Sequence, residues 1–278
     1  MIHSLHIGIN NYSGTGSDLY GCVNDARDWA SIFGASTPYT KLLLDKAATR
    51  VSILRYVEDL MAALGPGDLG VVTYSGHGTW IPDLNNDEKD GRDECWVPYD
   101  WDNLISDDEL YQLWRRRNSK SKLLLITDSC MNGTVYRMLP TTAIMNGRKP
   151  AAGSQRVRFL NPLVIRNRNP ARRSSVTSML QQVAAMPRKV KNPLERLPNG
   201  MLHLAGSADD EYCWDARING RNNGAFTAYA IASLKSLVDG ATFQDWYRDI
   251  LDFLPTADFP QRPQFHAGRA NAKMEIPF

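Results

Sequence analysis

The chain has 278 residues, of which 43% are hydrophobic and 22% charged, and its net charge is +2. This composition excludes wholesale disorder and points to no strongly charged partner for the chain as a whole. Its start lacks the basic and apolar regions of a signal peptide, no apolar run is long enough to span a membrane, and the four cysteines form no CxxC pair. We therefore expect a cytoplasmic protein with reduced thiols, and neither a zinc site nor a membrane partner.

Short apolar runs alternate with segments of helical periodicity along most of the chain. This alternation predicts an α/β fold, a three-layer sandwich with a mostly parallel central sheet of about six strands and helices on both faces. The acidic stretch 80–102 is expected to be a loop, and Asn24 or Asp25 is expected to cap the first helix. Strands are expected at residues 5–9, 41–44, 69–74, 123–127, 201–205 and 263–267, and helices at 26–33, 49–64, 107–117, 225–238 and 242–253.

Residues 137–200 break this rhythm. They contain thirteen Lys and Arg residues and a single acid, Glu195, so the segment carries about +12 and the rest of the chain about −10. A long connection without periodicity in a compact domain is usually functional or disordered. We expect one domain over 1–278, in which 1–136 and 201–278 are joined by this basic segment.

A histidine and a cysteine follow two of the expected buried strands. His77 lies between two glycines in the sequence SGHG at 75–78, and Cys130 ends the sequence DSC at 128–130. In adjacent parallel strands, both would lie at the carboxyl edge of the sheet, where α/β proteins build their sites. A histidine can take the proton of a thiol and so activate it as a nucleophile. The backbone N–H groups of Gly78 and Cys130 are candidates to stabilise an oxyanion.

These two motifs, which are 53 residues apart, resemble the signatures of the caspase–hemoglobinase clan, in its metacaspase-like branch (peptidase family C14). The similarity extends to residues 21–26, 87–98, 205–210 and 224–227, and so covers most of the chain except the basic segment. The resemblance implies the caspase–hemoglobinase fold and a cysteine endopeptidase with a His77–Cys130 dyad. After the cysteine this chain reads CMNG at 130–133, where metacaspases commonly have CHSG.

An acidic specificity pocket is expected beside the cysteine. Asp128 precedes Cys130 by two residues, and a carboxylate there favours a cationic side chain at P1, the residue after which the substrate is cut. The resemblance adds Cys22, Asp25 and Ser75 to this S1 pocket. We expect protein substrates cut after Arg or Lys; the alternative is that the two aspartates only cap a helix and satisfy backbone donors.

The resemblance also raises calcium as a ligand, although no cofactor is required for the dyad. The matching positions are Asp93, Asp107 and Asp108, while a further acid of that family's site falls on or near Arg137 here, which weakens the case. The acidic loop itself does not follow the EF-hand register. The alternative is a solvated acidic loop followed by a helix N-terminus.

Three interpretations of the basic segment remain open. As an activation linker it would be cut during maturation of a zymogen, by the enzyme itself or by an upstream protease, with Arg172, Arg173, Arg188 and Lys189 as candidate sites. As a cover it would be held on the acidic body by charge. A nucleic-acid contact is disfavoured because aromatic residues are not interleaved with the cations. For the whole chain, the alternatives to a protease are an inactive caspase-like scaffold that binds partners, and a legumain-like ligase or transamidase.

Overall fold

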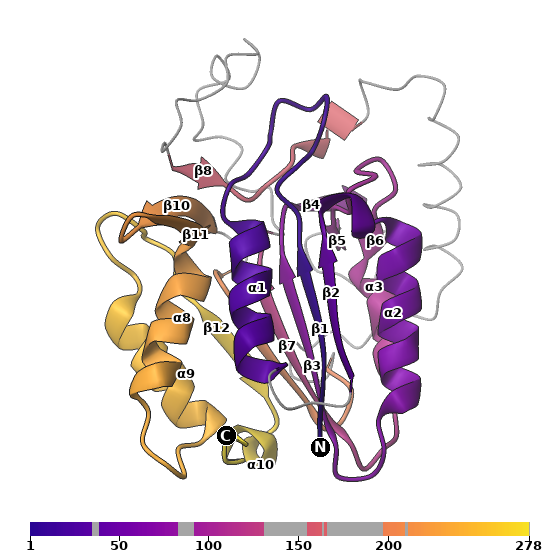
Figure 1. Ribbon diagram of the computed structural model, residues 1–278, viewed down its shortest axis with the longest axis vertical. Helices are drawn as coiled ribbons and strands as arrows, with labels where there is room; N and C mark the ends of the chain where they lie inside the picture. Colours follow the sequence, from indigo (N-terminus) through magenta and orange to yellow (C-terminus); the bar gives the residue numbers. More distant parts are fainter. Residues whose placement is uncertain are drawn as a thin grey trace.

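The computed structural model describes residues 1–34, 39–82, 92–130, 155–162, 164–165, 197–208 and 211–277. Its centre is a six-stranded sheet in the order β12-β9-β7-β3-β1-β2, in which only β12 runs antiparallel to its neighbour (Figure 1). The α/β sandwich expected from the sequence is therefore confirmed. In chain order the strands are β1 (Ile2–Gly8), β2 (Tyr39–Leu44), β3 (Leu69–Ser75), β7 (Lys122–Asp128), β9 (Met201–Ala205) and β12 (Gln264–Ala267).

Helices cover both faces of this sheet. Strand β7 shows why, because its apolar residues alternate between two cores: Leu123 and Leu125 belong to one cluster, Leu124 and Ile126 to the other. The first cluster packs under α2 (Arg50–Ala63) and α3 (Asp107–Trp114), and the second under α1 (Cys22–Phe33), α8 (Ala225–Ser236) and α9 (Phe243–Phe253). Two short helical turns, η1 (Asp45–Ala47) and α10 (Arg269–Ala272), follow β2 and β12. No helix in these ranges is long and apolar enough to cross a membrane.

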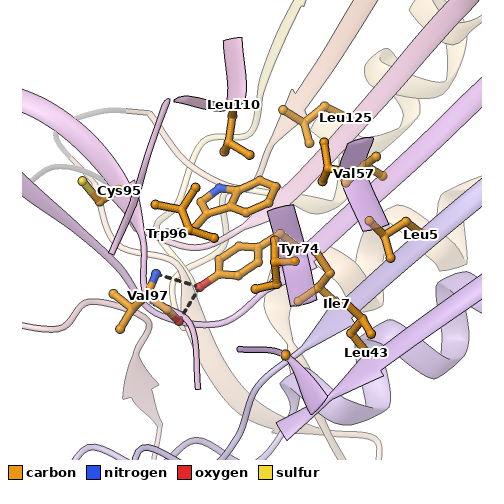
Figure 2. Packing of buried hydrophobic residues seen from close by; sticks show 14 of the residues in the cluster. Leu5, Ile7, Leu43, Val57, Tyr74, Cys95, Trp96, Val97, Leu110 and Leu125 are labelled. Atoms are coloured by element: carbon orange, nitrogen blue, oxygen red, sulfur yellow. Dashed lines mark hydrogen bonds between the residues drawn. The ribbon is translucent and has the colours of Figure 1, made fainter. Parts of the chain in front are cut away.

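The first core reaches the carboxyl edge of the sheet through Tyr74. Its ring stacks on Trp96 with centroids 4.4 Å apart, and its hydroxyl lies within hydrogen-bond distance of the backbone N and O of Val97 (Figure 2). The same hydroxyl donates to the carbonyl of His77 at 2.7 Å. The backbone at the end of β3 is thus held from inside the core.

Two expectations were wrong. The stretch 80–102 is not simply a loop: β4 (Gly78–Pro82) and β5 (Arg92–Trp96) form an antiparallel pair that β6 (Ile105–Ser106) extends. The alternation in β5 is hidden in the sequence because one of its buried positions is an aspartate, Asp93. The first helix begins at Cys22 with Gly21 as its N-cap, so neither Asn24 nor Asp25 caps it.

Part of the basic segment belongs to the fold. Strand β8 (Arg156–Val157) pairs antiparallel with β10 (Trp214–Ile218), which in turn pairs with β11 (Arg221–Gly224). This second three-stranded sheet lies beyond the carboxyl ends of the central strands, at the top of Figure 1, on the opposite side from both termini. It places residues of the segment over the sheet edge where the site was expected.

Candidate active site

Strands β3 and β7 are neighbours, and Ser75 pairs in register with Asp128. His77 and Cys130 each lie two residues beyond the strand ends, at the carboxyl edge of the sheet, and both are buried. The topology thus brings the histidine and the cysteine to one edge, because parallel neighbours end on the same side.

His77 is held by three contacts. Its Nε2 lies 2.6 Å from the carbonyl O of Ser17, its backbone N–H donates to the Tyr12 hydroxyl at 2.8 Å, and its ring lies against that of Tyr12. Burial lowers the pKa of His77 to about 4, although the Ser17 carbonyl acts in the opposite direction. The imidazole is therefore neutral at pH 7, with its proton on Nε2 and Nδ1 left as the acceptor.

Gly76 is required by the close packing behind this histidine. A Cβ at this position would lie 2.7 Å from the Tyr12 hydroxyl and 2.8 Å from the Tyr74 hydroxyl. Both hydroxyls position the His77 backbone, so a side chain at residue 76 would displace the groups that hold the imidazole. The glycine before the histidine thus has a steric role that the sequence alone does not specify.

The backbone of Arg158 crosses the site. Its carbonyl O accepts from the N–H groups of both Gly78, at 3.0 Å, and Cys130, at 3.1 Å. Its N–H donates to the carbonyl of Cys213 at 3.0 Å, and two residues later the N–H of Leu160 donates to the carbonyl of Gly78 at 2.9 Å. The two N–H groups expected to form an oxyanion hole therefore converge on one carbonyl oxygen, and that carbonyl belongs to an arginine.

The side chain of Arg158 is fully buried among three carboxylates. Nη2 lies 2.7 Å from Asp25 and 3.0 Å from Asp215, and Nη1 lies 3.2 Å from Asp128. Burial acts to lower the pKa of the guanidinium, but the carboxylates, Asp128 foremost, hold it well above its usual range. The pKa of Asp25 rises to about 6, chiefly because its carboxyl is buried; the charge of Arg158 opposes the rise and that of Asp128 adds to it.

Backbone and hydroxyl donors fix the two predicted carboxylates. Asp128 accepts from the N–H of Thr227, in the first turn of α8, at 3.0 Å and from its hydroxyl at 2.8 Å. Asp25 accepts from the N–H of Gly224 at 3.1 Å. Preorganised donors of this kind stabilise the ionised carboxylates and fix their positions, which lowers the cost of burying them around a cation.

Gly224 also leaves room for the guanidinium. A Cβ at this position would lie 2.0 Å from Asp128 Oδ2 and 2.5 Å from Arg158 Nη1. No real side chain accommodates such contacts, so the absence of a Cβ at residue 224 is what allows an arginine to reach Asp128.

The other residues predicted for the S1 pocket lie at the same place. Cys22 opens α1 and Ser75 ends β3, and both are buried. Burial raises the pKa of the Cys22 thiol; the charge of Arg158 acts to lower it and the three carboxylates act to raise it, so Cys22 lies within the field of this charge cluster.

Three residues of the site were not predicted. Asp215, on β10, is held by the N–H groups of Tyr20, at 2.7 Å, and Gly21, at 2.9 Å. Cys213 donates its N–H to Sγ of Cys130 at 2.6 Å. The third is Arg158, whose sequence setting does not distinguish it from the other cations of the basic segment. The four candidate cleavage residues, Arg172, Arg173, Arg188 and Lys189, lie outside the described residues.

The residues named for calcium lie on adjacent elements. Asp93 is on β5, and Asp107 and Asp108 open α3, which follows directly after β6, the strand paired with β5. Asp93 and Asp108 are buried. Within the part of the chain that the structure describes, no group of three or more His, Cys, Asp or Glu side chains is arranged to hold a metal ion.

An α/β sandwich with a histidine and a cysteine just beyond the carboxyl ends of adjacent parallel strands is the pattern of the caspase-like cysteine peptidases. Residues 3–139 match the family model of the metacaspase, peptidase C14 domain. The chain is 39% identical over 137 residues to metacaspase-4 of Arabidopsis thaliana and 30% identical over 256 residues to metacaspase-1 of Coccidioides immitis. The chain belongs to the metacaspase family.

The matches differ in how much of each protein they cover. They include 46% and 84% of this chain, but only 32% and 54% of those two relatives, respectively, so the chain spans a third to a half of their length. Metacaspase-1 of Ajellomyces capsulatus is 28% identical, with 94% of this chain and 78% of the relative covered. The crystal structure of protein GSU0716 from Geobacter sulfurreducens superposes with a TM-score of 0.74 at 28% identity, over 99% of this chain and 97% of that one.

Proposed function

We propose that this protein is a cysteine endopeptidase that cleaves proteins after Arg or Lys, and that it is made as a latent form inhibited by its own basic segment. The observation that carries the proposal is the position of Arg158. Its side chain fills a pocket of three carboxylates while its carbonyl O accepts from the N–H groups of Gly78 and Cys130. A substrate with arginine at P1 would need both contacts at once.

In the proposed reaction the thiol of Cys130 gives its proton to Nδ1 of His77, and the resulting thiolate attacks the P1 carbonyl carbon. The negative charge that develops on the P1 carbonyl oxygen is stabilised by the N–H groups of Gly78 and Cys130, which in this structure donate to the carbonyl O of Arg158. The C–N bond then breaks, His77 returns the proton to the leaving amine, and a thioester forms on Cys130. Water, activated by the same imidazole, hydrolyses the thioester and releases the carboxylate product.

Three features select the P1 residue. Three carboxylates without a cation would be costly to keep buried, and an arginine can contact several of them because its guanidinium carries five N–H donors. An aspartate at P1 would place a fourth negative charge in this cluster. Peptides that differ only at P1 test the choice: we expect hydrolysis after Arg and Lys and none after Asp, and loss of the Arg preference in Asp128→Asn. Equal rates after Arg and Ala would contradict the proposal.

Latency follows from the same contacts. Arg158 of the segment lies between the carboxylates proposed as the S1 pocket and against the N–H groups proposed as the oxyanion hole, and burial keeps His77 a weak base, with a pKa of about 4. We infer that activation requires cleavage of the Arg158–Phe159 bond or displacement of the segment, by the enzyme itself or by an upstream protease. Cleavage after the four arginine and lysine residues predicted from the sequence remains a prediction of its own.

The rival function is a scaffold that uses the same fold to bind partners without chemistry. An arginine-directed, cysteine-reactive probe separates the two, because an enzyme would be labelled at Cys130 and the label would be lost in Cys130→Ala. Failure to label the processed protein would favour the scaffold. A ligase would be recognised in the same assays by products joined to an added amine. Fractionation of cells that express the protein tests the cytoplasmic location.

Calcium dependence is a separate element of the proposal. We expect the three acids Asp93, Asp107 and Asp108 to contribute if the ion acts on this chain. The rates of peptide hydrolysis with calcium and with a chelator measure the calcium dependence directly. In Asp108→Asn, any difference between these two rates should disappear. Equal rates in both would remove calcium from the account.

A further inference from the structure

We propose that Cys213 is a site of oxidative modification: it forms a disulfide with Cys130 after a peroxide has oxidised that cysteine, and the bond switches the peptidase off reversibly. The inference rests on the proposed peptidase function, because it names how the nucleophile of that same site is regulated. Cys213 immediately precedes β10 and lies 83 positions after Cys130 in the chain, so only the fold brings the two together.

The sulfur of Cys130 lies against the backbone of Cys213. Sγ accepts from the Cys213 N–H at 2.6 Å, and it lies 3.5 Å from the carbonyl O of the same residue, to which it donates. Because an N–Cα bond is about 1.5 Å long, this sulfur is within about 4.1 Å of the Cys213 Cα. The two Cα atoms are therefore closer than about 7 Å, the separation beyond which a disulfide needs the backbone to move.

The thiol of Cys213 is buried beside that of Cys130. Burial raises the pKa of the Cys213 thiol, and the hydrogen bond with the Cys130 side chain adds to the rise, whereas the Ser207 hydroxyl, 3.2 Å from the sulfur, opposes it. Cys213 thus stays protonated, while Cys130 has His77 as the base of the proposed reaction. Since the thiolate is the form that reacts with peroxides, Cys130 is oxidised first and Cys213 is the cysteine that resolves it.

The body of the protein holds Cys213 in this position. The N–H of Trp214, the next residue, donates to the side-chain oxygen of Gln261 at 3.1 Å, and the amide of Gln261 donates to the carbonyl of Gly206 at 2.7 Å. A Cβ at Gly206 would lie 3.1 Å from the Cys213 sulfur, so the thiol packs closely against this backbone. Displacement of Arg158 therefore leaves Cys213 beside the nucleophile.

The latent form protects both thiols. The backbone of Arg158 is hydrogen-bonded to the backbone of Cys130 and of Cys213, and both cysteines are fully buried in this state. A cysteine that senses oxidants must be accessible to them. Oxidation therefore follows displacement of the segment that carries Arg158, and it acts on the active form of the enzyme.

The chemistry needs only hydrogen peroxide or another hydroperoxide as the oxidant. The thiolate of Cys130 attacks a peroxide oxygen, the O–O bond breaks, and hydroxide leaves and is protonated to water, which gives the sulfenic acid. The Cys213 sulfur then attacks the Cys130 sulfur, the S–S bond forms, and the S–O bond breaks. The hydroxide that leaves takes the Cys213 proton as water. The two thiols lose two electrons, and the peroxide gains them.

The test treats the full chain, after self-processing, with hydrogen peroxide, blocks the remaining thiols and maps the peptides without reduction. We expect a peptide pair that joins Cys130 to Cys213, together with a loss of P1-Arg hydrolysis that dithiothreitol reverses. In Cys213→Ser the peroxide should carry Cys130 on to the sulfinic and sulfonic acids, which thiols do not reduce. The recovered fraction of that variant's own untreated rate should therefore be at least about fivefold smaller. Cys95→Ser, which removes a buried thiol on β5, is the matched control and should recover like the unmodified protein.

The outcomes are distinct. Equal recovery in Cys213→Ser and in the unmodified protein, or a loss of activity without the linked peptide, would overturn the assignment of Cys213 and leave the peptidase proposal standing. If P1-Arg reporters are not hydrolysed before oxidation and the arginine-directed probe does not label Cys130, the peptidase proposal fails. The linked peptide, whose detection needs no activity, then decides the disulfide by itself. Should Cys213→Ser not fold, the peptide map and the recovery of the unmodified protein decide.

Discussion

Replacing Arg158 by glutamine should destabilise the latent protein far more than replacing a surface arginine. The change removes the cation from three buried carboxylates that lie 2.7–3.2 Å from it. Removing one partner of a buried ion pair costs about 3–5 kcal/mol, because the remaining charge is left uncompensated. At about 2–4 °C per kcal/mol for a domain of this size, we expect the Tm to fall by about 10 °C.

The assay is thermal unfolding in a Cys130→Ala background, where the chain stays intact. The matched control is Arg116→Gln, since the Arg116–Glu58 pair is exposed on both sides and such pairs contribute at most about 1 kcal/mol. The Arg158→Gln deficit should also shrink at pH 5 relative to pH 8, because carboxyls without a counter-ion have raised pKa values and lose their penalty when protonated. Equal Tm values for the two variants, or a deficit independent of pH, would refute the buried charge cluster.

Two further predictions follow from the same structure. Gly224→Ala should reduce kcat/KM for P1-Arg peptides at least 100-fold, because the added Cβ would clash with Asp128 and with any guanidinium beside it. Gly268→Ala is the control, since a Cβ there meets nothing closer than 3.7 Å and the activity should not change. Similar activity of the two variants would contradict the assignment of Gly224 to the P1 pocket. The urea midpoint should fall as pH drops from about 6.5 toward 4. Burial lowers the pKa values of His6, His77 and His203 to about 3, 4 and 3, so the unfolded chain takes up protons that the folded chain does not. The pKa of Asp25 is raised to about 6, which favours the folded state as the pH falls, but this single group opposes three histidines. A urea midpoint that stays constant or rises over this pH range would contradict the conclusion that the three histidines are buried in their neutral form.

The sheet and its edge were predictable because their signals are local. Buried parallel strands are continuous apolar runs, and a histidine or cysteine just beyond such a run must lie at the carboxyl edge. The neighbouring positions of β3 and β7 could only be assumed from the sequence, because β4, β5, β6 and α3 lie between these two strands in the chain. The strands of the small sheets carry weaker signals: β5 buries an aspartate, and β8 has only two residues.

The occupant of the pocket could not be predicted, because the choice among thirteen similar cations depends on tertiary register. Arg158 reaches the carboxylates only because β8 pairs with β10, and that pairing joins residues 57 and 59 positions apart in the chain. Asp215 was missed for the same reason, since its role depends on the backbone of residues 20 and 21 nearly two hundred positions earlier. Asp25 and Asp128, by contrast, could be assigned to the candidate site from the sequence, because both lie in motifs that carry the resemblance to the metacaspases.

The central claim, that the chain is a peptidase whose own segment lies in its site as a substrate, is tested most directly by mapping the termini that form on incubation. Purified full-length protein and Cys130→Ala protein are incubated in parallel, and the new N-termini are identified by mass spectrometry. We predict a new N-terminus at Phe159 in the unmodified protein and none in Cys130→Ala. Cleavage that is the same in both proteins, or an active protein in which the Arg158–Phe159 bond stays intact and the segment stays in place, would contradict the account.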